Sequence, residues 1–218
     1  MANTLYVANW KSNKTKAEAS AFWEYLANNI SQVDLSSKEL IVAPPFTLLS
    51  DAREFISTHN LPISLAGQNV SSFPKGAYTG EINAEQLKEF AEFVIIGHSE
   101  RLKYLHETNN DLENKVREAL EVGLRVIQCI QDENSIIQKG VEIVAYEPPS
   151  AIGSGNPDEP EHIAQVFDKI LQDNGKYTLL YGGSVNPQTI SQFKSITTLS
   201  GFLIGGASLD AQSFLSLL

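Results

Sequence analysis

Two residues of the kind used in general acid–base chemistry each follow an apolar segment of this sequence. Glu147 comes directly after the apolar run 141–146, and His98 follows the run 93–96 after a single glycine. Carboxylates and imidazoles are the usual groups that move protons in enzymes. Lys11 adds a cation shortly after a third apolar run. Taken alone, the stretch around Glu147 also fits an ordinary connection with a solvated carboxylate.

A second kind of chemistry is indicated by the glycines. Gly205 and Gly206 follow an apolar run and precede a short helical pattern, so their backbone N–H groups are free to bind a phosphate. Ser184 can add a hydroxyl from the preceding polar loop, and Gly153 lies in a Pro- and Gly-containing stretch typical of a hinged lid. The alternative is that these glycines are turn residues only.

The charged and imidazole side chains also have structural interpretations. Lys11 fits a solvated surface charge, and His98 fits a histidine satisfied by its neighbours Ser99 and Glu100. For Glu100 and Arg101 we expect a structural ion pair with each other. These interpretations do not predict that so many polar groups follow consecutive apolar runs.

Eight short β-type runs alternate with amphipathic helical patterns along the chain. The runs are 5–8, 40–43, 63–66, 93–96, 124–130, 141–146, 178–181 and 201–204. Eight such units in 218 residues predict one closed (β/α)8 barrel, with residues 1–218 as a single domain, rather than an open doubly wound sheet. The carboxyl ends of all eight strands of such a barrel meet at one mouth, so the polar groups above would face one another.

Glycines and spacing also predict the ends of the outer helices. Gly123, Gly140 and Gly175 each stand between a helical pattern and the next strand, where a left-handed helix C-cap is expected. Only 132–139 separate the fifth strand from the sixth, which leaves room for about two helical turns. After the eighth strand only 208–218 remain. We therefore expect shortened fifth and eighth helices.

Composition excludes several classes of partner. The formal net charge of -10 and pI near 4.8 argue against nucleic acid or an anionic membrane surface. Cys129, the one cysteine, lies in an apolar run and cannot form an internal disulfide, which favours a reducing compartment. The first ten residues have neither a basic leader nor a long apolar stretch, so we expect a cytoplasmic protein.

Seven motifs resemble those of the triosephosphate isomerase family, in the same order and over nearly the whole chain. They are Asn-Trp-Lys at 9–11, Gln-Asn-Val-Ser at 68–71, Gly-Ala-Tyr-Thr-Gly-Glu at 76–81, Gly-His-Ser-Glu-Arg at 97–101, Ala-Tyr-Glu-Pro at 145–148, Tyr-Gly-Gly-Ser-Val at 181–185 and Gly-Gly-Ala-Ser-Leu at 205–209. One motif alone would be weak, but seven together are specific. The fold implied by the resemblance is a TIM barrel.

The resemblance also implies an activity: cofactor-free and metal-free interconversion of dihydroxyacetone phosphate and D-glyceraldehyde 3-phosphate through an enediolate, in glycolysis and gluconeogenesis. It implies Glu147 as catalytic base, His98 as electrophile, and Lys11 with Asn9 as substrate-binding residues. The phosphate contacts it implies come from Gly153, Ser184, Gly205 and Gly206. It further implies that the loop 68–81 projects into a second subunit, so we expect a homodimer, with a tetramer as the alternative.

The chain departs from the family pattern at three places. Ser150 stands where the family usually has a tryptophan in the lid, and the lid start and the trimmed helices resemble archaeal members. Asp132 ends a Cys-Ile-Gln-Asp run where Cys-Ile-Gly-Glu is common, and Leu102 replaces a basic residue. These differences concern lid motion and assembly. Two other interpretations stay open here: another phosphate-binding barrel, acting on a phosphorylated indole or ribulose, and a non-catalytic binding or structural protein that kept the barrel.

Overall fold

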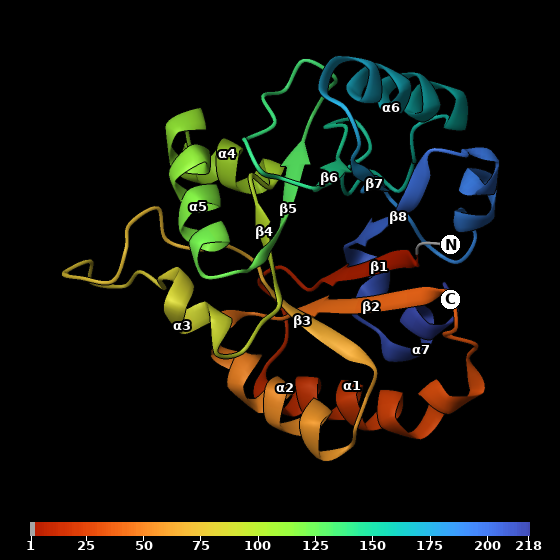
Figure 1. Ribbon diagram of the computed structural model, residues 1–218. Helices are drawn as coiled ribbons and strands as arrows, with labels where there is room; N and C mark the ends of the chain where they lie inside the picture. The colour runs from red at the N-terminus through yellow and green to blue at the C-terminus, as the bar shows by residue number, and fades with distance from the viewer. Residues whose placement is uncertain (1–2) are drawn as a thin grey trace.

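The computed structural model describes residues 3–218, so residues 1 and 2 of the expected domain lie outside it. Its eight parallel strands form a closed barrel in chain order, and β8 pairs with β1 (Figure 1). The strands are β1 (Thr4–Asn9), β2 (Lys38–Ala43), β3 (Ile63–Gly67), β4 (Phe93–Ile96), β5 (Arg125–Ile130), β6 (Ile143–Tyr146), β7 (Thr178–Tyr181) and β8 (Leu199–Ile204). The predicted barrel and its eight strands are confirmed.

The strands are buried on both faces, which explains their nearly continuous apolar sequences. Leu5 and Val7 of β1 and Phe93 and Ile95 of β4 belong to a buried cluster inside the barrel. The alternate residues, such as Val94, belong to a second and larger cluster between the strands and the outer helices. A strand covered on both sides must be apolar at both sets of positions. The barrel interior is therefore a packed core that holds the strand ends rigidly.

Helices surround most of the barrel (Figure 1). The α-helices are α1 (Lys16–Asn29), α2 (Phe46–Thr58), α3 (Ala84–Lys88), α4 (Ser99–Leu105), α5 (Asn109–Glu121), α6 (Pro160–Asn174) and α7 (Ala211–Leu215), and the 3-10 helices are η1 (Ile30–Gln32), η2 (Ile190–Ser195) and η3 (Gly206–Ser208). Thr15, Asn83 and Thr108 begin α1, α3 and α5 with capping boxes. Within residues 3–218 no helix is both long enough and apolar enough to cross a membrane.

The connection between β5 and β6 contains no α-helix, so the prediction of a shortened fifth helix at 132–139 was wrong. Gln128, on the outer face of β5 and 1% exposed, binds this connection with both ends of its amide. Its Nε2 donates to the Ile136 carbonyl at 2.8 Å, and its Oε1 accepts from the Gln138 N–H at 2.8 Å. The loop thus packs against β5 through a side-chain amide, in the place where a helix would otherwise pack.

The expected glycine caps are realised in part. Gly123 follows α5 with φ 74°, as predicted. Gly140 has φ 88° but no helix precedes it, and Gly175 ends α6 with φ 99° and ψ -141°, outside the left-handed helical region. The eighth helix is short, as expected, since only η3 and the five residues of α7 follow β8.

Candidate active site

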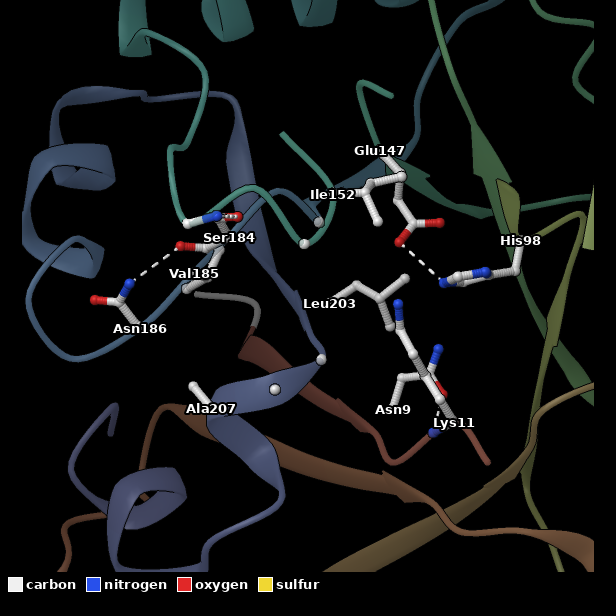
Figure 2. Close-up of a pocket in the computed structure, with 15 residues that line it drawn as sticks. Asn9, Lys11, His98, Glu147, Ile152, Ser184, Val185, Asn186, Leu203 and Ala207 are labelled. Atoms are coloured by element: carbon white, nitrogen blue, oxygen red, sulfur yellow. Dashed lines mark hydrogen bonds and ion pairs between the residues drawn. The ribbon is translucent and has the colours of Figure 1, made fainter. Parts of the chain in front are cut away.

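A cavity of about 220 Å³ lies at the mouth of the barrel, between the carboxyl ends of the strands and the loop after β6 (Figure 2). All eight residues that the sequence assigned to a site line it: Asn9, Lys11, His98, Glu147, Gly153, Ser184, Gly205 and Gly206. They come from the ends of β1, β4, β6, β7 and β8 and the loops that follow. The structure thus brings the predicted residues together, and their chemical roles stay predictions.

Glu147 and His98 face each other across one side of this cavity (Figure 2). Glu147 Oε1 lies 3.2 Å from His98 Nε2, and the two side chains are only 5% and 6% exposed. The Glu147 N–H donates to the Ile130 carbonyl at 2.8 Å, so the β5–β6 ladder continues to the acid itself. Gly182 provides room for the carboxylate, because a Cβ at this position would lie 2.8 Å from Glu147 Cγ. The acid is therefore held beside the imidazole by two neighbouring strands.

The hydrogen bond at the other ring nitrogen defines the state of His98. His98 is the N-cap of α4, and its Nδ1 lies 3.2 Å from the Glu100 backbone N. A backbone N–H can only donate, so Nδ1 must be the acceptor and carries no proton. The ring in this arrangement is a neutral imidazole with its N–H at Nε2. That N–H is directed toward the cavity and Glu147.

Two buried atoms of this pair have no hydrogen-bond partner among residues 3–218. They are Glu147 Oε2, an acceptor, and His98 Nε2, a donor whose 3.2 Å contact with Glu147 Oε1 does not have hydrogen-bond geometry. Buried polar groups in native proteins are nearly always paired with protein or water, so a ligand bound in this cavity would find both a donor and an acceptor open to it. Burial inside the barrel raises the pKa of the Cys129 thiol, and the neighbouring Glu147 carboxylate raises it further.

Lys11 is held in an uncommon backbone conformation, with φ 52°. Its N–H donates to Asn9 Oδ1 at 3.0 Å, and its carbonyl accepts from Gln68 Nε2 at 2.9 Å. Its ammonium binds Glu100 Oε1 at 2.5 Å. The same side chain lies near Gly205, where an added Cβ would lie 3.5 Å from Lys11 Cε. The cation is thus fixed between the imidazole and the glycine turn.

Glu100 therefore pairs with Lys11, and the prediction that Glu100 and Arg101 pair with each other was wrong. Arg101 Nε instead binds Glu107 Oε1 at 2.5 Å. The physical reason is that successive helix residues point in different directions, so the two side chains of α4 find partners on different loops.

The lid, 148–159, covers the cavity. The Gly155 N–H donates to Ser184 Oγ at 3.1 Å, and the same hydroxyl donates to the Ala151 carbonyl at 2.5 Å. Further along, the Asp158 N–H donates to Tyr181 OH at 2.7 Å. Ala151 is 1% exposed, and Ile152 lines the cavity. These contacts join the lid to the end of β7 and to the loop that follows it.

Two functional contributions were missed in the sequence. Leu203, two residues before Gly205 in the chain, lines the cavity from β8. Gln68 fixes the Lys11 backbone from a distant loop. Leu203 is an apolar residue in an apolar run, so no sequence signal distinguished it. Gln68 was visible only as the first residue of a polar loop. Among residues 3–218, no group of three or more His, Cys, Asp or Glu is placed to hold a metal ion.

Comparison with known proteins gives one consistent family. The triosephosphate isomerase family model matches residues 4–218. The triosephosphate isomerase of Endomicrobium trichonymphae is 35% identical over 249 aligned positions, covering 100% of this chain and 98% of the relative. That of Aquifex aeolicus is 34% identical, covering 96% of each chain. These relatives are bacterial, and the archaeal likeness of the lid stays a prediction.

A solved structure agrees. The crystal structure of triosephosphate isomerase from Bartonella henselae has a TM-score of 0.84 and 31% sequence identity, covering 99% of this chain and 97% of that chain. The alignment with the Endomicrobium protein spans 249 positions against 218 residues here, so that relative has segments that this chain lacks. The chain belongs to the triosephosphate isomerase family, whose members interconvert dihydroxyacetone phosphate and glyceraldehyde 3-phosphate in glycolysis.

Proposed function

We propose that this chain carries out the family reaction at the barrel mouth, with Glu147 as the base and His98 as the electrophile. The observation that carries the proposal is the pair of buried atoms without partners among residues 3–218, Glu147 Oε2 and His98 Nε2, on one small cavity. When a proton leaves the carbon next to a carbonyl, an acceptor must take that proton and a donor must stabilise the carbonyl oxygen. Glu147 Oε2 and His98 Nε2 supply one of each.

The chemistry is a proton transfer in two halves. Glu147 takes a proton from the carbon beside the carbonyl, the C–H electron pair becomes the carbon–carbon double bond, and the carbonyl π pair moves to its oxygen. The neutral His98 donates its Nε2–H to that oxygen, and Lys11 adds positive potential. Glu147 then returns the proton to the adjacent carbon, and the proton between the two oxygens is redistributed. The net result is an exchange of aldehyde and ketone with no change in composition.

The phosphate is held, in this proposal, by the glycine turn and the lid. Gly205 and Gly206 expose backbone N–H groups at the start of η3, with open space where a Cβ of Gly206 would stand. Ser184 and Gly153 line the same cavity. Closure of the lid excludes water, which protects the enediolate from expelling its phosphate. Asn9 contributes to substrate binding beside Lys11.

The test is a coupled isomerase assay of the wild type beside Glu147→Gln. The amide keeps the size of the side chain but cannot accept the proton, so turnover should fall by at least about a thousandfold, equivalent to about 4 kcal/mol of barrier. The thermal unfolding midpoint should be unchanged. A Glu147→Gln variant with wild-type turnover would remove Glu147 as the base and would reopen the non-catalytic interpretation.

We also propose that the chain forms a homodimer through the loop 68–81. The loop extends away from the barrel (Figure 1), and its Phe73 and Tyr78 are 46% and 41% exposed with rings stacked at 4.4 Å. Large exposed aromatic side chains are typical of subunit contacts. Beside the active site lies a second cavity of about 410 Å³, lined by Lys11 and by the exposed Tyr104. A loop from a second copy would fill this cavity and cover the Lys11 segment.

Thr79→Arg tests the dimer, since Thr79 is an exposed residue of this loop. An arginine there would bury an unpaired charge in the contact, so the protein should shift toward monomer and lose activity together. Sedimentation equilibrium over a dilution series measures the mass. A wild-type monomer with full activity at nanomolar concentration would contradict the proposal, and an unchanged mass in Thr79→Arg would show that this loop is not the contact. A tetramer is the alternative outcome.

The proposal also covers the domain organisation and the cellular location. Residues 1–218 act as a single domain, supported by the continuous barrel core of the described residues. The location is cytoplasmic, supported by Cys129, which is buried and free.

A further inference from the structure

Asp158 lies at the junction of the lid and α6, and no step of the reaction above uses its side chain. Its backbone N–H donates to Tyr181 OH at 2.7 Å. Its carboxylate is 19% exposed and accepts from three groups on three parts of the chain. These are the Glu159 N–H at 2.9 Å, the Tyr146 hydroxyl at 3.4 Å and His162 Nδ1 at 2.6 Å.

The partners connect the end of the lid to the catalytic strand. Tyr146 is the last residue of β6 and directly precedes Glu147, and its side chain is buried beside Tyr181, with ring centroids 6.3 Å apart. Burial and the neighbouring Asp158 carboxylate raise the pKa of Tyr146, so its hydroxyl keeps the proton that it donates. His162 lies in the first turn of α6 and is 56% exposed. One carboxylate thus joins the lid, the strand before the catalytic acid and the following helix.

Within residues 3–218, the acid on the loop after β5 makes no comparable hydrogen bond to the lid. Asp132, on the loop after β5, uses its carboxylate within its own turn, where Oδ1 accepts from the Asn134 N–H at 2.8 Å and from Ser135 Oγ at 3.2 Å. Ser150, near the start of the lid, is exposed. Side chains therefore anchor the lid at two places: Ser184 binds Ala151 and Gly155 in its middle, and Asp158 lies at its carboxyl-terminal end.

We propose that Asp158 is a positioning residue that holds the lid closed over the reaction intermediate. It also fixes the end of the lid relative to the end of β6, where Glu147 lies. The proposal rests on the proposed roles of Glu147 and the lid. With the carboxylate removed, the Tyr146 hydroxyl no longer binds residue 158 of the lid, and the closed conformation of the lid becomes less populated. The intermediate then meets water more often.

The consequence can be measured as a change in product ratio. In an opened site the enediolate can eliminate its phosphate: the carbon–oxygen bond to the phosphate breaks, its electron pair leaves with inorganic phosphate, and the remaining enol becomes a three-carbon dicarbonyl compound. No oxidant, reductant or other co-reactant is needed. Inorganic phosphate released per isomerisation therefore reports how well the lid shields the intermediate.

The experiment compares Asp158→Ala and Asp158→Asn with the wild type, using dihydroxyacetone phosphate and measuring both isomerisation and inorganic phosphate. Loss of hydrogen bonds to a charged group should lower kcat/KM about tenfold in Asp158→Ala and raise phosphate release per isomerisation about tenfold. Asp158→Asn keeps an acceptor for the Glu159 N–H but loses the charge, so its phosphate release should still rise clearly. Tyr146→Phe, which removes only the hydroxyl, should raise it by about threefold.

Two controls separate this role from a purely structural one. Glu159→Ala removes a carboxylate one residue further on that makes no side-chain cap on α6, and it should leave the ratio unchanged. His162→Ala removes the exposed partner and should change the ratio by less than about twofold. If Asp158→Ala and Asp158→Asn lower the unfolding midpoint but release phosphate at the wild-type ratio, the carboxylate only starts α6 and the inference is overturned.

Failure of the catalytic proposal would look different. Glu147→Gln should lose isomerisation and phosphate release together, because no enediolate forms. If Glu147→Gln keeps both activities, the base has been misassigned. If it loses both while Asp158→Asn and Tyr146→Phe match the wild type in ratio, the catalytic proposal stands and the Asp158 inference fails.

Discussion

Buried polar groups on the outer face of the barrel and at its mouth differ in whether they have hydrogen-bond partners. On the outer face, the Gln128 amide is 1% exposed and both of its ends are bound by the loop 131–142. At the mouth, His98 Nε2 and Glu147 Oε2 are also buried and have no hydrogen-bond partner among residues 3–218, although Nε2 lies 3.2 Å from Glu147 Oε1. The strand scaffold is the same, so the difference lies in what the surrounding chain supplies.

This difference distinguishes buried polar groups that stabilise the fold from those that are available to a ligand. An amide whose donor and acceptor are both satisfied stabilises one conformation of the loop around it. A donor and an acceptor left open on a cavity cost stability unless a ligand binds them. Five buried side-chain atoms in the described residues lack partners, and only the two at the mouth belong to residues that line this cavity. Under the proposed function, that cost is offset when substrate binds at the mouth.

Of the two substitutions considered next at the barrel mouth, His98→Gln and Lys11→Ala, we expect His98→Gln to lower activity more. Glutamine can donate a hydrogen bond, but its amide is placed differently and is not held by the Glu100 N–H. We expect turnover to fall by about a hundredfold with little change in the unfolding midpoint. Steady-state kinetics beside a thermal melt decides the point. Full activity in His98→Gln would mean that the histidine is structural, as its neighbours allow.

Lys11→Ala should have the next largest effect, on binding and turnover together. It removes the ammonium that lies between the glycine turn and the imidazole, and it frees Glu100. We expect kcat/KM to fall by at least about tenfold, and added salt should lower kcat/KM in the wild type because screening weakens the encounter with an anionic substrate. If the variant bound 2-phosphoglycolate and turned over like the wild type, Lys11 would be a solvated charge.

Gln128→Leu should have the smallest effect on activity and a clear effect on stability. The change leaves the Ile136 carbonyl and the Gln138 N–H without their partner, which should cost about 2 kcal/mol of unfolding free energy. Turnover should stay within about twofold of the wild type, since the amide faces away from the cavity. Chemical denaturation measures the first quantity and the coupled assay the second.

Gln131→Leu is the matched control, three residues further along the chain. Its Nε2 is buried without a partner in the described chain, so the same substitution removes an unsatisfied group and should not destabilise the protein. Equal losses of stability in the two variants would contradict the distinction between satisfied and unsatisfied amides.

The barrel and the location of its site were accessible from the sequence because each depends on short-range pattern. Two-sided burial makes runs such as 93–96 apolar throughout, and β4 has those same bounds. A polar residue directly after such a run must lie at the mouth of a parallel barrel, so the sequence predicts His98 and Glu147 at the strand ends where the structure has them, while their roles stay predictions.

What the sequence did not show depends on contacts between distant segments. Glu100 binds Lys11 rather than its neighbour Arg101, a pairing across 89 positions that local spacing cannot reveal. The loop 131–142 has room for a helix, but the Gln128 amide stabilises an irregular path instead. Asp158 carries no motif in the sequence, and only the fold brings Tyr146 and Tyr181 to it.

The most direct test of the central claim is a crystal structure with 2-phosphoglycolate, which carries a carboxylate and a phosphate in the positions of the intermediate. We predict the ligand carboxylate within hydrogen-bond distance of His98 Nε2 and Glu147, with the phosphate on the Ser184 hydroxyl and on the N–H groups of Gly153, Gly205 and Gly206. Binding with Gly153 far from the phosphate would contradict the proposed lid closure. A ligand that left His98 Nε2 and Glu147 Oε2 still without partners would contradict the claim that these open atoms mark the catalytic site.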